Sequence, residues 1–213
     1  MGGGSPPFTT RCRRSRLVNA AMFLIRRPSR SRIEDFLERQ CSQSFSYAEV
    51  GSTRKTPPAA YTVDRNRVRL GSGYQTFHRA ATALQSWRMF GIGWAELFPS
   101  KTPVDVGVTV AVLVNHFGFW SLNACRIVYV FQEERRFGFA YGTLRDHAEQ
   151  GEERFSVEWL ADDDSVFYDI LAFSRPRKWQ ARVFQPLCRR LQRKFARDSM
   201  AEVKRAVEGI EST

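Results

Sequence analysis

The most informative absences in this 213-residue chain are those of catalytic and metal-binding motifs. Its three histidines, His78, His116 and His147, are too far apart to match the spacing of metal ligands. The chain has no P-loop, no nucleophile elbow around a serine and no HExxH motif. We therefore expect neither a metal site nor a cofactor.

Cysteines and long apolar runs are also scarce. The four cysteines, Cys12, Cys41, Cys125 and Cys188, form no CxxC pair. We interpret Cys125 and Cys188 as small core residues, and the pattern suits a reducing, cytoplasmic location. No stretch approaches the roughly 18 apolar residues of a membrane helix, so we expect a soluble domain without a membrane span.

Acidic residues are missing from the N-terminus, and this accounts for most of the net charge of +11. Residues 1–32 contain eight arginines and no acid, which leaves only +3 for the rest of the chain. The body is nearly balanced, which argues against nucleic-acid binding, since that needs a basic face on the folded domain. We expect 1–32 to be a basic, disordered extension. Within it, 1–21 is either a false start before Met22 or a native tail, and its composition also fits a transit peptide.

The body contains patterns of helices and strands in a simple order. Ser31 and Glu34 fit a capping box that opens a helix ending by Ser42, and a strand is expected near 61–70. A helical apolar stripe follows over 74–90. The pattern then predicts a helix from after Pro176 to about 207, with a kink or break near Phe184 caused by Pro186. Between these helices we expect six strands, at 94–98, 107–115, 124–132, 137–143, 154–160 and 165–173.

Consecutive strands with helices only at the ends imply an antiparallel sheet with one face to cover. The amphipathic C-terminal helix is the natural cover. We therefore predict an α+β, helix-grip fold, in which a curved antiparallel sheet of about seven strands wraps around a long C-terminal helix. Its expected parts are an N-terminal helix and linker at 33–58, one domain at 59–208 and a disordered tail at 209–213. A cavity would form between sheet and helix.

Motifs along most of the body resemble those of a known family. They are YAEVGST at 47–53, LGSGYQTF at 70–77, GIGW at 91–94, RIVYV at 126–130, FGFAYGTLRDHAEQGEERF at 137–155, FYDILAFSRP at 167–176 and PLCRRLQRKFAR at 186–197. With these motifs the chain resembles the "domain of unknown function 1990" family, also called uncharacterised protein family 0548, over about residues 45–207. The resemblance implies one compact domain and brings no substrate or catalytic assignment. The likeness to the START and birch-allergen superfamily is an analogy of fold.

The segment 137–155 carries the candidate acid–base residues. His147 lies close in sequence to Glu152 and Glu153, and a histidine near carboxylates can act as a proton shuttle. Strand alternation sends the two glutamates to opposite faces, so at most one points inward. In the alternative interpretation these residues build a turn, with His147 bonded to loop backbone and Gly151 allowing a positive φ.

Four further residues are candidates for ligand contact. Tyr141 and Thr143 lie on one face of their strand, where their hydroxyls would orient a ligand or simply pack. Trp94 begins the first of the six consecutive strands. Arg126 lies in an apolar strand and is either half of a structural ion pair or an anion clamp. The acidic partners that we consider for it are Glu152, Glu158 and Asp169.

Three functions remain open from the sequence. The first, which these residues favour over an enzyme, is a binding module that holds a small hydrophobic ligand between the sheet and the C-terminal helix. The second is an enzyme of the cyclase, dehydratase or hydrolase type that uses His147 with Glu152 or Glu153. The third is a protein–protein adaptor that presents the basic C-terminal helix through Arg189, Arg190, Arg193, Lys194 and Arg197.

Overall fold

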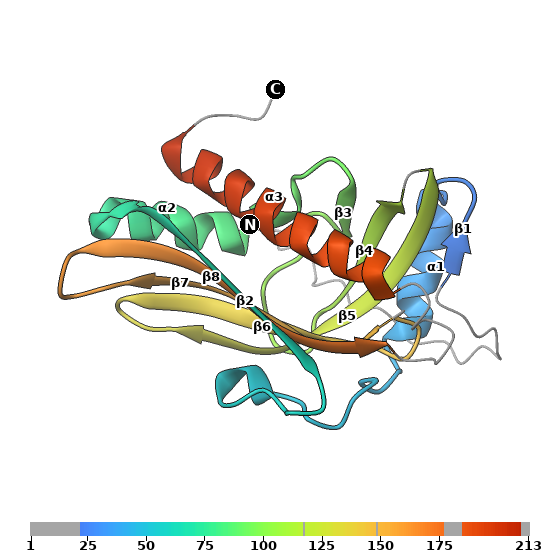
Figure 1. Cartoon of the computed structure of the whole chain (residues 1–213). Coiled ribbons are helices and arrows are strands. Elements are labelled where there is room, and N and C mark those ends of the chain that lie inside the picture. Colours follow the sequence, from blue (N-terminus) through green and yellow to red (C-terminus); the bar gives the residue numbers. More distant parts are fainter. Residues whose placement is uncertain (1–21, 117, 148, 177–184, 210–213) are drawn as a thin grey trace, which may run out of the picture.

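A curved antiparallel sheet forms the centre of the computed structural model, which describes residues 22–116, 118–147, 149–176 and 185–209 (Figure 1). Its strand order is β2-β8-β7-β6-β5-β4-β3, and β1 pairs additionally with β5. The described strands are β1 (Met22–Leu24), β2 (Thr62–Ser72), β3 (Ala95–Phe98), β4 (Thr109–His116), β5 (Phe119–Gln132), β6 (Arg136–Thr143), β7 (Glu149–Trp159) and β8 (Ser165–Pro176). The predicted helix-grip fold is confirmed.

Strand β5 is long enough to serve three neighbours. Its first half pairs with β4 and, from Trp120 to Leu122, also with β1. Its second half, from Cys125 onward, pairs with β6. The sequence pattern started this strand five residues too late, because Ser121 and Asn123 interrupt the apolar run although both are buried.

Among the described residues, five helical segments flank the sheet: α1 (Arg30–Gln40), η1 (Ser52–Arg54), α2 (Gly73–Gln85), η2 (Arg88–Phe90) and α3 (Gln185–Glu208). Helices α2 and α3 lie on one side of the sheet, and η1 lies on the other (Figure 1). Helix α1 buries Ile33 and Phe36 against Leu113 and Leu122. The alternate residues of β4 and β5, such as Val112, face the larger core beneath α2 and α3. The two faces of the sheet therefore support two separate cores.

The N-terminal boundary differs from the expected one. Residues 22–24 form β1, and Arg27 pairs with Glu96 at 2.6 Å, so the ordered chain begins before position 33. The capping box at Ser31 is wrong, since the N-cap is Ser29, whose side chain accepts a hydrogen bond from the backbone N–H of Arg32. The expectations for residues 1–21 lie outside the described residues.

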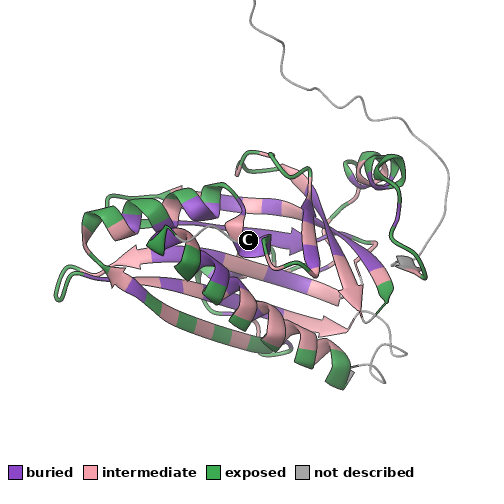
Figure 2. Ribbon diagram, turned by 90° about the horizontal axis from the view of Figure 1, so that it is seen from above, coloured by how far each residue is buried: buried purple, intermediate pink, exposed green. Residues whose placement is uncertain are grey.

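Helix α3 divides into two halves that make different contacts. Its C-terminal half buries Ser199, Val203 and Val207, and the Ser199 hydroxyl lies 2.9 Å from the hydroxyl of Tyr168. Figure 2 shows the helix lying across the strands with exposed residues along its outer side. Pro186 stands in the first described turn of α3. The kink expected near Phe184 lies outside the described residues.

Within the described ranges, no helix is both long and apolar enough to cross a membrane.

Candidate functional site

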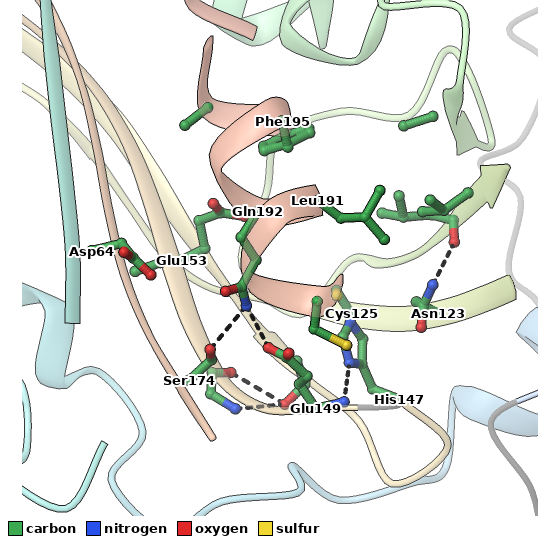
Figure 3. A pocket seen from close by; sticks show the side chains of 18 of the residues that line it. Asp64, Asn123, Cys125, His147, Glu149, Glu153, Ser174, Leu191, Gln192 and Phe195 are labelled. Atoms are coloured by element: carbon green, nitrogen blue, oxygen red, sulfur yellow. Dashed lines mark hydrogen bonds between the residues drawn. The ribbon is translucent and has the colours of Figure 1, made fainter. Parts of the chain in front are cut away.

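A cavity of about 650 Å³ lies between the inner face of the sheet and the N-terminal half of α3 (Figure 3). This volume falls in the range of small-molecule sites, roughly 300–1,000 Å³. Because the C-terminal half of α3 packs on the core while the other half stands over the cavity, one helix both closes the fold and forms a wall of the site. The apolar side chains of the wall include Phe90, Trp94, Val112, Val114, Ile170, Leu191 and Phe195.

A polar network joins α3 to the ends of β7 and β8 at the cavity wall (Figure 3). The Gln192 side-chain amide donates to Glu149 Oε2 at 2.6 Å and to Ser174 Oγ at 3.0 Å. Burial raises the pKa of the Glu149 carboxyl, which the hydrogen bonds of Ser174 and Gln192 partly oppose. Neutral donors thus hold a carboxyl group that the cavity makes costly to ionise.

Glu153 is the carboxyl group most strongly affected by the cavity. Burial, with the nearby charges of Asp64 and Glu149, raises its pKa from 4.5 to about 7, although the hydrogen bond of Tyr141 works in the opposite direction. The Tyr141 hydroxyl donates to Glu153 Oε2 at 2.7 Å. Glu153 Oε1 has no hydrogen-bond partner among the described residues. A carboxyl group that titrates near neutrality can either give or take a proton.

His147 lies beside Glu149 in the cavity wall (Figure 3). Its Nδ1 accepts the backbone N–H of Glu149 at 3.0 Å, and burial lowers its pKa from 6.5 to about 4. The ring is therefore neutral near pH 7, with its proton on Nε2. His147 therefore fits both interpretations of the sequence. Its Nδ1 holds the backbone of the loop, and its ring also lines the cavity.

Glu152 points away from the cavity, on the opposite face of β7 from Glu153. It is 2% exposed and accepts hydrogen bonds from the Tyr47 hydroxyl at 2.7 Å and from the backbone N–H of Gly51 at 2.6 Å. Both the backbone N–H and the hydroxyl of Thr53 also donate to it. The segment before β2 supplies all four donors, so this carboxylate fixes that segment to the sheet and has a structural role.

Of the other sequence candidates, Tyr141 and Trp94 contribute to the wall directly. The Trp94 indole N–H donates to Asp198 Oδ2 at 2.9 Å, so its ring edge is fixed. Thr143 lies in the wall, but its hydroxyl accepts the Gly151 backbone N–H at 2.9 Å and lies 2.6 Å from the Ser46 hydroxyl. Because the Thr143 hydroxyl is occupied by these bonds, Tyr141 is the one of the two candidate hydroxyls that bonds to Glu153.

Arg126 is not part of the cavity wall. Its guanidinium donates to the backbone carbonyls of Gln40, Cys41 and Gln43 at 2.9–3.0 Å. The expected acidic partner is wrong: the guanidinium binds carbonyls at the C-terminal end of α1, where a cation is favoured.

Comparison with known proteins places the chain in a family. Residues 46–202 match the model described as "Domain of unknown function (DUF1990)". The chain belongs to this family. A UPF0548 protein of Dictyostelium discoideum is 34% identical over 207 residues, covering 87% of this chain and 96% of that protein. A UPF0548 protein of Deinococcus radiodurans is 40% identical over 190 residues, covering 83% and 94%.

Two solved structures have similar folds at low sequence identity. Norcoclaurine synthase from Thalictrum flavum gives a TM-score of 0.47 at 11% identity and covers 72% of this chain and 90% of that one. Ara h 8.0201 gives a TM-score of 0.45 at 10% identity, covering 70% and 99%. At such identities the likeness concerns the fold alone.

The DUF1990 match spans the described cavity wall, from Asp64 to Ala196. The polar residues of this wall that sequence reasoning missed include Asp64, Glu149 and Gln192. The signal for Glu149 was strand alternation, because it lies four positions before Glu153 on the same face of β7. It was missed because the predicted strand began only at Arg154. Within the described residues no group of three or more His, Cys, Asp or Glu side chains could hold a metal ion.

Proposed function

We propose that this DUF1990 domain binds a small, largely apolar ligand in the cavity between the sheet and α3. The cavity of about 650 Å³, with walls mainly of aromatic and aliphatic side chains, carries the proposal. Protein interiors are otherwise filled to the density of organic crystals. A space of this size beneath a helix is best explained as room for a ligand.

The few polar groups of the wall fit the same role. Binding sites for small molecules are mostly apolar and have a small number of fixed polar groups that orient the ligand. The Nε2–H of neutral His147 supplies a donor, and the Glu153–Tyr141 pair supplies an acceptor. Both are held by hydrogen bonds within the domain, which limits the cost of ordering them on binding.

Filling the cavity with a larger side chain tests the proposal. Ala172 lies in the cavity wall, opposite Glu153 on the neighbouring strand, so Ala172→Trp would occupy the space. Ala201→Trp is the matched control, because Ala201 is exposed on α3. In a fluorescence titration with Nile red, we expect saturable binding by wild type and by Ala201→Trp, and at least tenfold weaker binding by Ala172→Trp. Unchanged affinity in a folded Ala172→Trp protein would contradict the proposal.

A ligand acquired in the cell would be direct support. Native mass spectrometry of the protein purified from its own host should reveal a mass increment that denaturation removes. The Ala172→Trp variant should lack the increment, whereas Ala201→Trp should retain it. An increment that persists in Ala172→Trp would place the bound molecule outside the cavity.

The second candidate function is acid–base catalysis of the cyclase, dehydratase or hydrolase type. Glu153 favours it, because a cavity carboxyl with a pKa of about 7 suits a general acid or base. Glu152 has no part in it, because its carboxylate is occupied by four donors. For a substrate identified by mass spectrometry, Glu153→Gln should abolish turnover while binding persists. Unchanged turnover would exclude this candidate.

The adaptor hypothesis has less support. Three of the five basic residues proposed for it pair with acids of this chain: Arg189 with Asp64, and both Lys194 and Arg197 with Asp198. Such pairs reduce the charge that α3 can offer to a partner. Affinity capture with Arg190→Glu and Arg193→Glu variants would test the two basic residues that remain.

A further inference from the structure

The cavity has more carboxyl groups than cations at one end. Asp64, Glu149 and Glu153 come from the sheet side of the cavity, whereas Leu191 and Phe195 come from α3 (Figure 3). Asp64 and Glu149 are close enough to Glu153 for their charges to disfavour its ionisation. This end of the site therefore has an excess of negative charge whenever all three groups are ionised.

The existing partners compensate only part of this charge. Arg189 forms a two-pronged ion pair with Asp64, with Nη2 2.6 Å from Oδ1. Glu149 receives its hydrogen bond from the neutral amide of Gln192. Glu153 receives only the Tyr141 hydroxyl, and its Oε1 has no hydrogen-bond partner among the described residues. Glu149 and Glu153 therefore each keep one oxygen available to a ligand, and Glu153 is the one bonded to the aromatic side chain of Tyr141.

The aromatic side chain of Tyr141 contacts the same carboxyl group, and two further rings follow it in the cavity wall. The ring of Tyr141 lies 6.4 Å from that of Phe90, which lies 5.3 Å from Phe195. The faces of such rings attract cations, and a buried carboxylate is stable only when a cation or several donors compensate it. An anionic head group here would meet three carboxyl groups, whereas the two guanidiniums near the cavity belong to Arg189, which is paired with Asp64, and to Arg193 on α3.

Building on the proposed ligand-binding role, we propose that the ligand is a cationic amphiphile. Its protonated amine pairs with Glu153 beside Tyr141, and its apolar body lies between the sheet and α3. The cation supplies the counter-charge that this end of the cavity lacks. The aliphatic and aromatic wall removes the rest of the molecule from water.

Three probes with one body and different head groups test the inference: phenylbutylamine, phenylbutanol and phenylbutyrate. Affinities would be measured at pH 8 by isothermal titration calorimetry and by displacement of Nile red. We expect the amine to bind at least tenfold more tightly than the alcohol, a ratio that corresponds to about 1.4 kcal/mol, and the carboxylate to bind most weakly. Glu153→Gln should reduce the ratio of amine affinity to alcohol affinity to about one, and circular dichroism verifies that the variant folds.

Glu133→Gln serves as the charge-matched control, because Glu133 lies in an exposed turn, and it should behave as wild type. If the dye and the alcohol bind while the amine has no advantage, the cationic-ligand inference is overturned and the proposed function stands. A preference for the amine that survives in Glu153→Gln would overturn the role of Glu153. If no probe and no dye binds, the proposed function fails and the inference fails with it.

Discussion

Replacing two neighbouring glutamates with glutamine should change the stability of the protein in opposite directions. Glu152 and Glu153 are adjacent on β7 but point to opposite faces of the sheet. Glu152→Gln removes a charge that four donors stabilise, whereas Glu153→Gln removes a charge that the cavity destabilises. The two variants have the same composition and net charge, so only the environments of the side chains distinguish them.

The loss for Glu152→Gln follows from its hydrogen bonds. A glutamine retains one acceptor oxygen, and its NH₂ group would face donors from Tyr47, Gly51 or Thr53. The backbone N–H of Gly51 or of Thr53 would then lose its acceptor, and the hydroxyl beside it would have to turn to accept from the NH₂ group, at about 1–3 kcal/mol for each disrupted bond. We expect a loss of about 2–5 kcal/mol, a large share of the roughly 5–15 kcal/mol by which domains are stable.

The gain for Glu153→Gln follows from its pKa, which rises from 4.5 to about 7 on folding. Because the folded protein holds this proton more tightly, the stabilisation is complete below pH 4.5 and is lost as the pH rises through 7. The shift corresponds to about 3 kcal/mol at full ionisation. Glutamine keeps an acceptor for Tyr141 and is never charged. We therefore expect Glu153→Gln to exceed wild type by about 1–3 kcal/mol at pH 8, and by less at pH 5.

Urea denaturation followed by circular dichroism at pH 5 and pH 8 measures these differences, with Glu133→Gln as the control. The raised pKa values of Glu149 and Asp169 leave some pH dependence in every variant. The comparison between variants at one pH removes this common contribution. The reasoning is refuted if Glu152→Gln is as stable as wild type, or if Glu153→Gln is less stable than wild type at pH 8.

Three further predictions concern other parts of the chain. Gly142→Ala should cost about 3 kcal/mol or more in urea denaturation, because the new Cβ would collide with the Tyr47 hydroxyl oxygen; a loss below about 1 kcal/mol would show that Tyr47 moves aside. A chain that starts at Met22 should keep its melting temperature within about 4 °C, whereas one that starts at Pro28 loses β1 and should melt lower; equal melting of both would contradict a role for β1. The His147 ring should titrate near pH 4 in nuclear magnetic resonance spectra, so the stability that its burial confers is present above pH 6.5 and is lost toward pH 4; titration near 6.5 would show a solvated ring.

The sequence predicted the fold well because the fold depends on periodicity. Alternation and turn residues located six consecutive strands, and the amphipathic C-terminal helix required a sheet face to cover. Strand ends were less accurate where polar side chains are buried by pairing, as at Ser121 and Asn123 in β5. Strand β1 could not be found in this way, because three residues are too few to establish a period.

The site was only partly predictable, because its residues meet through tertiary contacts. Alternation correctly separated Glu152 from Glu153, but it did not indicate which face held the cavity. The three carbonyls that receive Arg126 lie more than 80 positions away along the chain. Gln192 reaches Glu149 only because α3 crosses the ends of β7 and β8. No local sequence pattern predicts either contact, that of Arg126 with the carbonyls or that of Gln192 with Glu149.

The two faces of β7 account for the chemical difference between neighbouring residues. On one face, Gly142 leaves room for Tyr47 to approach the sheet and donate to Glu152, so a backbone segment far away in sequence is held by one carboxylate. On the other face, Ala172 beside Glu153 leaves space, and that space is part of the cavity. Small residues next to each carboxyl group thus decide whether another part of the chain reaches it or a cavity remains beside it. The same reasoning predicts that filling the space at Ala172 should abolish ligand binding without disturbing the Tyr47–Glu152 contact, which lies on the other side of the sheet.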